Sequence, residues 1–347
     1  MYIKVSWDKE FEELMLYLKL KYKDKMFNAD GIGDDTLDLN KFSKSFFTNN
    51  TTTADVSVDS NSNVTAKTSV EYTFELPKPL KRLNSYFLLW KQLKKQFDID
   101  FANKVIEMQL CGDIYINDFT DVALSYCFNY STNDVAYNGL KGISRRLDVK
   151  PPKSFSTFIR QVEQFVVYAA NSTLGATGLA DILVVGSHFV RKIKETGYDG
   201  HIKINDLHQY LYEILVNFIY TLNWEYRGNQ SPFTNISVYD DYFLDNFIND
   251  YYSPIDGKPV DKEIVKFLQD IFIDAMNDEL SRNPITFPVT TACFSVITQA
   301  DLDSGKWDGF ELNEAKDKNF VKYIAEKNKK FCFINMYAGE TSQLSSC

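Results

Sequence analysis

Five cysteines and three histidines carry the most reactive side chains of this 347-residue chain. A cysteine reacts or binds metal as its thiolate, and otherwise behaves as a small buried apolar group. These cysteines are widely spaced without a C-x-x-C pair, so the sequence encodes neither a disulfide framework nor a zinc ribbon. The histidines form no H-E-x-x-H motif or other metal-binding pair, so we predict no metal site and expect structural or exposed histidines. The residues are Cys111, Cys127, Cys293, Cys332, Cys347, His188, His201 and His208.

The elements that must position these residues begin after an irregular amino-terminal region. Short helical patterns up to about Phe47 are broken by the turn cluster DGIGDD. Residues 48–69 are almost free of apolar side chains and rich in Asn, Ser and Thr, so they cannot bury enough surface to form a core. We therefore expect residues 1–75 to form a cap and a polar loop, and residues 76–347 to form the main domain.

Apolar residues at three- and four-residue spacings predict five helices after Pro77. Three of them have N-cap residues, which are Ser154 or Ser156, Asp206 and Asp261. The predicted helices cover residues 80–97, 101–110, 155–169, 207–222 and 264–275.

Short apolar or alternating runs between and after these helices predict strands. Because parallel neighbours need crossover connections, long helices between short buried strands indicate an α/β fold with a largely parallel sheet. The predicted strands are residues 112–119, 234–239, 285–289, 293–298 and 331–336.

Composition and charge exclude several classes of protein. The formal charge of −9 argues against direct DNA binding, because Lys and Arg dominate contacts to phosphate. Aromatic residues make up 15% of the chain, which excludes a disordered protein. No apolar run approaches the roughly 20 residues of a membrane span. The first residues, MYIKVSWDKEFEEL, lack the features of a secretory signal, so we expect a cytoplasmic protein.

Four local sequences carry a resemblance to a known family. They are GDIYINDF at 112–119, the Cys127-Phe128 pair, NQSPFTNISVYD at 229–240 and NPITFPV at 283–289. Their order and spacing resemble those of anaerobic, class III ribonucleotide reductases, and residues 150–184 are similar to the family as well. The whole chain looks like the amino-terminal half of such an enzyme, ending at the finger-loop cysteine.

The resemblance implies a fold and a chemistry. The fold is the first half of a ten-stranded α/β barrel of the glycyl-radical type, with a helical amino-terminal cap. The chemistry converts ribonucleoside triphosphates to deoxyribonucleoside triphosphates for DNA replication. A glycyl radical, installed by an activase that uses S-adenosylmethionine and an iron–sulfur cluster, oxidises a cysteine to a thiyl radical. That radical removes the ribose 3′-hydrogen, and a closed barrel shields it from solvent.

The resemblance assigns roles to two cysteines. Cys127 stands where the family places a second active-site cysteine on an early strand, which implies a hydrogen-donating or radical-supporting role. The alternative for Cys127 is a small buried hydrophobe. Cys347 closes TSQLSSC, which resembles the approach to the finger-loop cysteine. Family members have adjacent cysteines followed by Arg-Leu there, so Cys347 is either the thiyl-forming residue or its neighbour.

Polar residues are implied as substrate contacts in the same way. Asn235, Ser231 and Thr234 lie at a strand start, where amide and hydroxyl groups can bind ribose hydroxyls or phosphate. The alternative is ordinary hydrogen bonding at a strand end. Asn63 and Asn117 are weaker candidates for contacts with the substrate or its surroundings, and both could instead cap turns.

The departures from the family lead to expectations about partners. Neither the radical-glycine segment nor the four-cysteine zinc site of the family occurs in this chain, and its start resembles no ATP-cone module. We expect the chain alone to be inactive, to bind no cofactor directly, and to need a complementing carboxy-terminal half, either from a split gene or from a longer chain. The other expected partners are the substrate, dNTP and ATP effectors, the radical activase and a second copy of the complete enzyme.

Two alternatives remain beside this interpretation. One is another glycyl-radical enzyme, such as a formate-lyase or diol-dehydratase relative. Nucleotide binding would distinguish a reductase from such an enzyme. The other is a non-catalytic half that only binds nucleotides or regulates a partner, which would show affinity without turnover.

Overall fold

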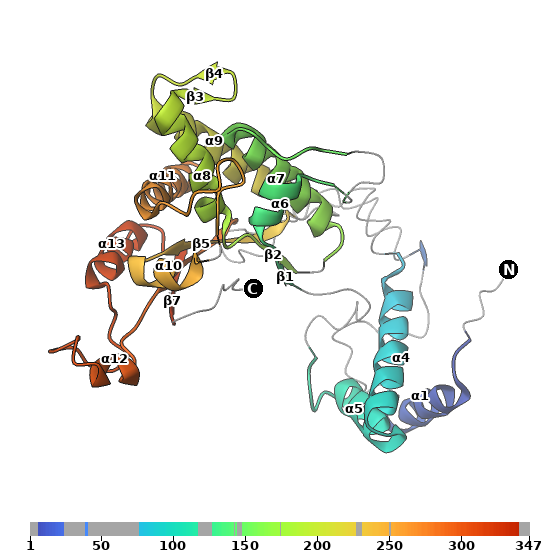
Figure 1. Ribbon diagram of the computed structural model, residues 1–347. Coiled ribbons are helices and arrows are strands. Elements are labelled where there is room, and N and C mark those ends of the chain that lie inside the picture. The colour runs from blue at the N-terminus through green and yellow to red at the C-terminus, as the bar shows by residue number, and fades with distance from the viewer. Residues whose placement is uncertain are drawn as a thin grey trace. The chain divides into compact units, whose positions relative to one another are not determined.

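The computed structural model describes residues 6–23, 39–40, 76–116, 127–141, 143, 148–173, 175–226, 231–249 and 251–339 (Figure 1). Its contacts divide the chain into two compact units. We call Met1–Ala54 with Val64–Tyr126 the amino-terminal unit, and Asp55–Asn63 with Cys127–Cys347 the sheet unit. The predicted division after residue 75 concerns where a catalytic barrel begins, and it stays a prediction.

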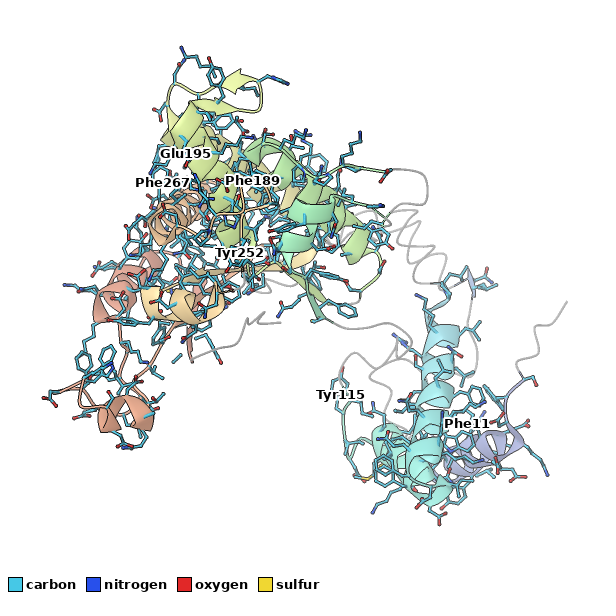
Figure 2. The ribbon with its side chains drawn as sticks, viewed as in Figure 1. Phe11, Tyr115, Phe189, Glu195, Tyr252 and Phe267 are labelled. Carbon is cyan, nitrogen blue, oxygen red and sulfur yellow. The ribbon has the colours of Figure 1, made fainter. Side chains whose placement is uncertain are left out.

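The described part of the amino-terminal unit contains α1 (Lys9–Tyr22), α4 (Lys78–Gln96) and α5 (Ile99–Cys111). These helices bury a core that includes Phe11, which Figure 2 labels, and Trp90. The Trp90 indole N–H donates to Asn103 Oδ1 at 2.8 Å, so the buried ring keeps a polar partner.

The predicted strand at 112–119 is wrong over its described residues. Gly112 ends α5 in the left-handed region, at φ 86°, and residues 112–116 form a turn and an irregular segment. The side chain of Gln109 accepts the Ile116 amide at 2.8 Å, which satisfies this N–H without a neighbouring strand. The rest of the predicted strand lies outside the described residues.

The sheet unit is built on five parallel strands in the order β1-β2-β5-β6-β7. This confirms the predicted α/β architecture with a parallel sheet. A separate antiparallel hairpin, β3 with β4, stands at the top of the view in Figure 1. The strands are β1 (Phe128–Asn129), β2 (Ala176–Gly178), β3 (Tyr198–Asp199), β4 (Ile202–Lys203), β5 (Phe233–Tyr239), β6 (Val289–Phe294) and β7 (Ile334–Ala338).

Every crossover between neighbouring parallel strands in the described chain contains helices. Among the helices, α7 follows Ser154, α9 follows Asp206 and α11 follows Asp261, and each of these side chains accepts a backbone N–H as predicted. The helices are α6 (Thr132–Asn138), α7 (Phe155–Ala170), α8 (Ile182–Thr196), α9 (Leu207–Leu222), α10 (Asp241–Phe247), α11 (Lys262–Leu280), α12 (Gln299–Asp303) and α13 (Lys318–Asn328).

The strand order gives the sheet two different faces. The strands follow chain order without reversal, so right-handed crossovers place the connecting helices on one face. On β5, Ile236 and Val238 belong to the same buried cluster as Leu215 of α9 and Leu268 of α11. Because side chains alternate along a strand, Asn235 and its same-parity neighbours point to the other face. We call these the helix face and the polar face.

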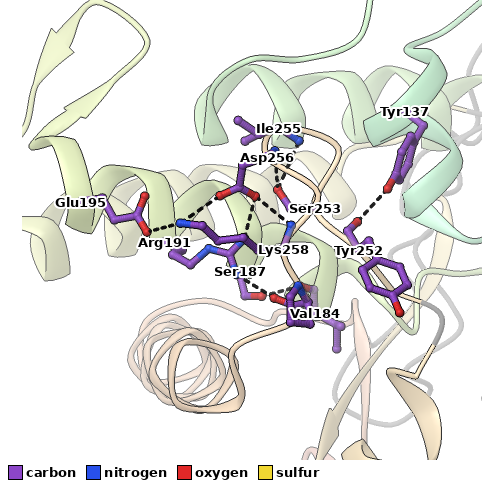
Figure 3. Close-up of polar contacts among 11 residues, drawn as sticks. Tyr137, Val184, Ser187, Arg191, Glu195, Tyr252, Ser253, Ile255, Asp256 and Lys258 are labelled. Atoms are coloured by element: carbon purple, nitrogen blue, oxygen red, sulfur yellow. Dashed lines mark hydrogen bonds and ion pairs between the residues drawn. The ribbon is translucent and has the colours of Figure 1, made fainter.

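A loop between α10 and α11 is fixed against α8 by polar contacts (Figure 3). Arg191 of α8 donates to the Pro259 carbonyl at 2.7 Å and to Asp256 Oδ1 at 2.9 Å. Lys258 pairs with Glu195 at 3.0 Å, and the Tyr137 hydroxyl donates to the Tyr252 carbonyl at 3.0 Å. The loop is therefore anchored at both α6 and α8.

The carboxylate of Asp181, at the start of α8, joins three segments at the carboxyl end of the sheet. It is 1% exposed and accepts the Ser131 hydroxyl at 2.6 Å and the Tyr251 hydroxyl at 3.1 Å. It also accepts both the amide and the hydroxyl of Thr132 at 2.8 Å. One side chain thus ties the end of β1 and the α10–α11 loop to α8.

Replacement of this carboxylate should strongly destabilise the sheet unit. Asp181→Ala leaves the buried amide and hydroxyl of Thr132 without their acceptor, together with the Ser131 and Tyr251 hydroxyls at part-buried bonds. We expect the free energy of unfolding to fall by about 3 kcal/mol. Urea denaturation followed by circular dichroism measures the change. Asp308→Asn, at an exposed position of the same unit, is the control and should lie within about 0.5 kcal/mol of wild type. An Asp181→Ala curve that overlays the wild-type curve would contradict this role.

Candidate functional site

A polar hydrogen-bonded cluster occupies the polar face in the middle of the sheet. Asn235 Nδ2 donates to Thr291 Oγ1 at 3.0 Å, and the Ser237 hydroxyl approaches Asn235 Oδ1 at 3.5 Å. All three side chains are buried, with Asn235 and Ser237 at 0% exposure. The register pairs Ser237 directly with Thr291 across β5 and β6. The site therefore offers amide and hydroxyl groups in a water-poor surrounding, where hydrogen bonds are strong.

Cys127 lies at the amino end of β1, which β2 separates from β5 and its polar cluster in the sheet. Its sulfur accepts the Ala176 amide at 3.2 Å, and the ladder continues from Phe128 paired with Thr177. Gly178 of β2 pairs with Asn235, so no side chain is added to the polar face at that position of β2.

The other described cysteines, Cys111, Cys293 and Cys332, are free thiols. Cys293 pairs with Tyr239 at the carboxyl end of the polar face, where α10 packs over the sheet. Burial raises the pKa of the Cys293 thiol to about 12, so it stays protonated at neutral pH.

The start of β6 is held by the side chain of Asn223, the residue that ends α9. Its Oδ1 accepts the amides of Thr286 and Phe287, each at 3.0 Å, and its Nδ2 donates to the Phe287 carbonyl at 2.6 Å. This amide takes the place of a neighbouring strand, so the predicted strand at 285–289 is wrong over residues 285–288, and β6 begins at Val289. Pro288 has no N–H for a ladder, which is the local reason.

The predicted site residues fall into three groups. Asn235 joins the polar cluster, and Ser231 is fully buried two residues before β5. Thr234 points to the helix face, where it pairs with Thr177, and its hydroxyl has no partner in the described part of the chain. Cys347, Asn117 and Asn63 lie outside the described residues, so their expected roles stay predictions. Sequence reasoning missed Ser237, although its position two residues after Asn235 in the predicted strand places both on one face. It also missed Thr291, which joins them only through the β5–β6 register.

His188 of α8 is also buried, at 1% exposure, and belongs to the helix side of the unit. Burial lowers its pKa to about 4, and the charge of Arg191 acts in the same direction. The imidazole is therefore neutral at physiological pH.

The described ranges contain neither a metal-binding cluster of acidic, His or Cys side chains nor a helix that could span a membrane. Within them, no group of three or more His, Cys, Asp or Glu side chains is arranged to hold a metal ion. Nor does any described helix combine the length and apolar character that crossing a bilayer requires.

Comparisons with known proteins agree with this geometry. The family model for anaerobic ribonucleoside-triphosphate reductase matches residues 84–347. The chain is similar to the Thermotoga maritima anaerobic ribonucleotide reductase solved with dATP and CTP, at 29% identity and a TM-score of 0.79, over 98% of this chain and 51% of that chain. A second structure of that enzyme, with dATP in the specificity site, gives the same identity and TM-score and is covered over 52%. The chain thus spans about half the length of the solved structures it matches. No curated protein matches it.

Asp240, which follows β5, gives the site a measurable pH dependence. Burial raises its pKa to about 6, although the amides of Phe243 and Ser295 donate to it and favour the charged form. From about pH 4, the ordinary value, to about pH 6, the folded state keeps a proton that the unfolded chain releases. Its contribution to stability should therefore fall as pH rises through this window.

Urea unfolding of wild type and Asp240→Asn between pH 4 and pH 7 tests this. The stability of wild type relative to the variant should decrease from about pH 4 to pH 6 and then level off. Asp308→Asn controls for the loss of an exposed carboxylate. If the difference in free energy of unfolding between wild type and Asp240→Asn does not change with pH in this window, the pKa of Asp240 is not raised.

Proposed function

Because the chain belongs to the family of anaerobic ribonucleoside-triphosphate reductases, we propose that it is the amino-terminal catalytic portion of such an enzyme, binding a ribonucleoside triphosphate against its polar face. The observation that carries this proposal is the hydrogen-bonded set of Asn235, Ser237 and Thr291 in the middle of the polar face. Family membership follows from a match over residues 84–347.

The polar cluster has unused hydrogen-bonding capacity for a ligand. An asparagine amide has two N–H donors and two acceptor lone pairs. In the described chain, the Asn235 side chain donates to Thr291 and accepts from Ser237, which leaves one N–H and one lone pair. Ribose hydroxyls both donate and accept hydrogen bonds, so they can bind the remaining N–H and lone pair of Asn235. The Thermotoga maritima complex contains dATP and CTP. We propose nucleotides of these two classes as the effector and the substrate of this chain.

Reduction at the ribose requires two electrons and two protons. The C2′ hydroxyl leaves as water, and the electrons come either from formate, which becomes carbon dioxide, or from two thiols, which become one disulfide. Cys127, half-buried beside β2, is the described cysteine that we assign to this chemistry as a hydrogen donor or radical-supporting group. A glycyl radical in a complementing half, installed by a separate activase, would supply the oxidising equivalent, with Cys347 as the thiyl residue or its neighbour.

A complementing half would also cover the edges of the sheet. Phe128 on β1 is 39% exposed and Met336 on β7 is 44% exposed, whereas β6 between its two neighbours is largely buried. Exposed apolar edge strands favour pairing with other strands. We propose that a second five-stranded half covers these edges and closes the barrel around the polar face.

Nucleotide binding by paired variants tests the substrate site. Asn235→Leu removes the amide at nearly constant volume, and we expect binding of CTP to weaken at least about tenfold. Isothermal titration calorimetry on the full chain gives the affinity, and thermal unfolding checks the fold. The neighbouring Thr234→Val is the matched control on the helix face, and it should bind as wild type without loss of stability.

The two variants also test the expectation that Thr234 contacts the substrate. Loss of binding in Thr234→Val with wild-type binding in Asn235→Leu would reverse the assignment and contradict our proposal. Turnover after addition of a complementing half and an activase separates a catalytic half from a nucleotide-binding half, which would show affinity alone.

Self-association measures whether the sheet edges need a partner. We expect the chain alone to self-associate in sedimentation velocity, and the double variant Phe128→Lys with Met336→Lys to be mainly monomeric, because charge blocks edge pairing. Leu312→Lys, at a 50% exposed position outside the sheet, should leave self-association unchanged. A wild-type chain that stays monomeric at all concentrations would argue against an obligate second half.

A further inference from the structure

The amino-terminal unit contains a cavity of about 420 Å³, within the range of small-molecule sites. It lies between the segment before α1 and the first turns of α4. Its walls are mainly apolar, and all its lining residues belong to this one unit. They are Ser6, Trp7, Pro77, Leu80, Lys81, Leu83, Asn84 and Phe87.

Two aromatic walls of the cavity are fixed by one buried ring. Phe11, at 0% exposure, contacts Trp7 edge-on with ring centroids 5.6 Å apart. It also contacts Phe87 at 5.3 Å. Trp7 and Phe87 are therefore held in place before any ligand arrives, and preorganised aromatic surfaces bind flat rings with little loss of conformational freedom.

The polar groups of the cavity are unpaired within the described part of the chain, and they favour an anion. The side chains of Ser6, Lys81 and Asn84 make no hydrogen bond or ion pair with any residue that the structure describes. No lining residue is acidic, and the nearby Asp8 lies 3.6 Å from Lys91. The hydroxyl, ammonium and amide groups can thus all donate to one negatively charged group.

The start of α4 adds to this preference. Its N-cap residue, Pro77, gives no side-chain cap, and its first turn contains no acid. The free N–H groups and the helix dipole at such an end favour negative charge.

We propose that this cavity binds a flat aromatic molecule that carries an anionic group, with the ring against Trp7 and Phe87 and the anion at Lys81 and Asn84. A nucleoside phosphate and an aryl carboxylate share this chemistry. The proposal does not depend on nucleotide binding at the polar face.

Calorimetric titration of the full chain with ATP and with indole-3-acetate tests the proposal. All proteins carry Asn235→Leu, which weakens binding at the polar face, and the cavity variants below identify the binding that belongs to the cavity. We expect binding of at least one probe at concentrations up to about 1 mM. Tighter binding of ATP would assign the cavity to nucleoside phosphates, and tighter binding of indole-3-acetate to aryl carboxylates. Adenosine has the flat ring without the anion, and inorganic triphosphate has the anion without the ring. If ATP is the tighter probe, both should bind more weakly than ATP.

Variants locate the binding within the cavity. Lys81→Met should weaken it about fivefold, since an exposed charge pair contributes up to about 1 kcal/mol. Asn84→Trp should abolish it by filling the space. Lys95→Met, on the same helix outside the cavity, is the matched control and should bind as wild type. No binding of either probe, or undiminished binding by a folded Asn84→Trp variant, would overturn the proposal.

Discussion

The parallel pairing of β5 with β6 is the constraint on which the rest of the sheet unit depends. It places Asn235 beside Val289 and Ser237 beside Thr291, and it sends Ile236 and its neighbours into the helix-packed core. A slip by one residue would exchange the two faces, burying an amide among aliphatic side chains. The apolar core thus fixes the register, and the register in turn brings the polar groups of two strands together.

Side-chain amides complete the sheet where neighbouring strands end. Gln269 of α11 accepts the Tyr239 amide at 2.8 Å and donates to the Tyr239 carbonyl at 3.1 Å, as a paired strand would. Asn223 does the same before β6 begins. Because buried backbone groups must be paired, these two side chains define where β5 ends and where β6 starts. They fix the length of the face on which the polar cluster lies.

Local sequence patterns predict much of this fold, but some of its elements cannot be predicted from such patterns. The caps Ser154, Asp206 and Asp261 were readable because a polar residue directly precedes an amphipathic stripe. Helix α8 was missed because Ile182 to Arg191 is buried on all sides, and such a run also fits a strand. Strand β2 is three small or hydroxyl residues, too short for a pattern. Asn235 was found through a family motif, whereas its partner Thr291 depends on a register that sequence alone does not reveal.

Buried polar groups are hydrogen-bonded on one face of β5 and unbonded on the other. This difference indicates that the polar face is the functional face. On the helix face, the hydroxyls of Thr177 and Thr234 have no partner in the described chain, so these residues serve there as β-branched packing groups at some cost. On the polar face, Asn235, Ser237 and Thr291 bond to one another, yet the Asn235 amide retains an N–H and a lone pair. This network holds the Asn235 amide in one orientation and leaves part of it unbonded. The amide is therefore preorganised for a polar ligand, because its conformational entropy is already lost before the ligand binds.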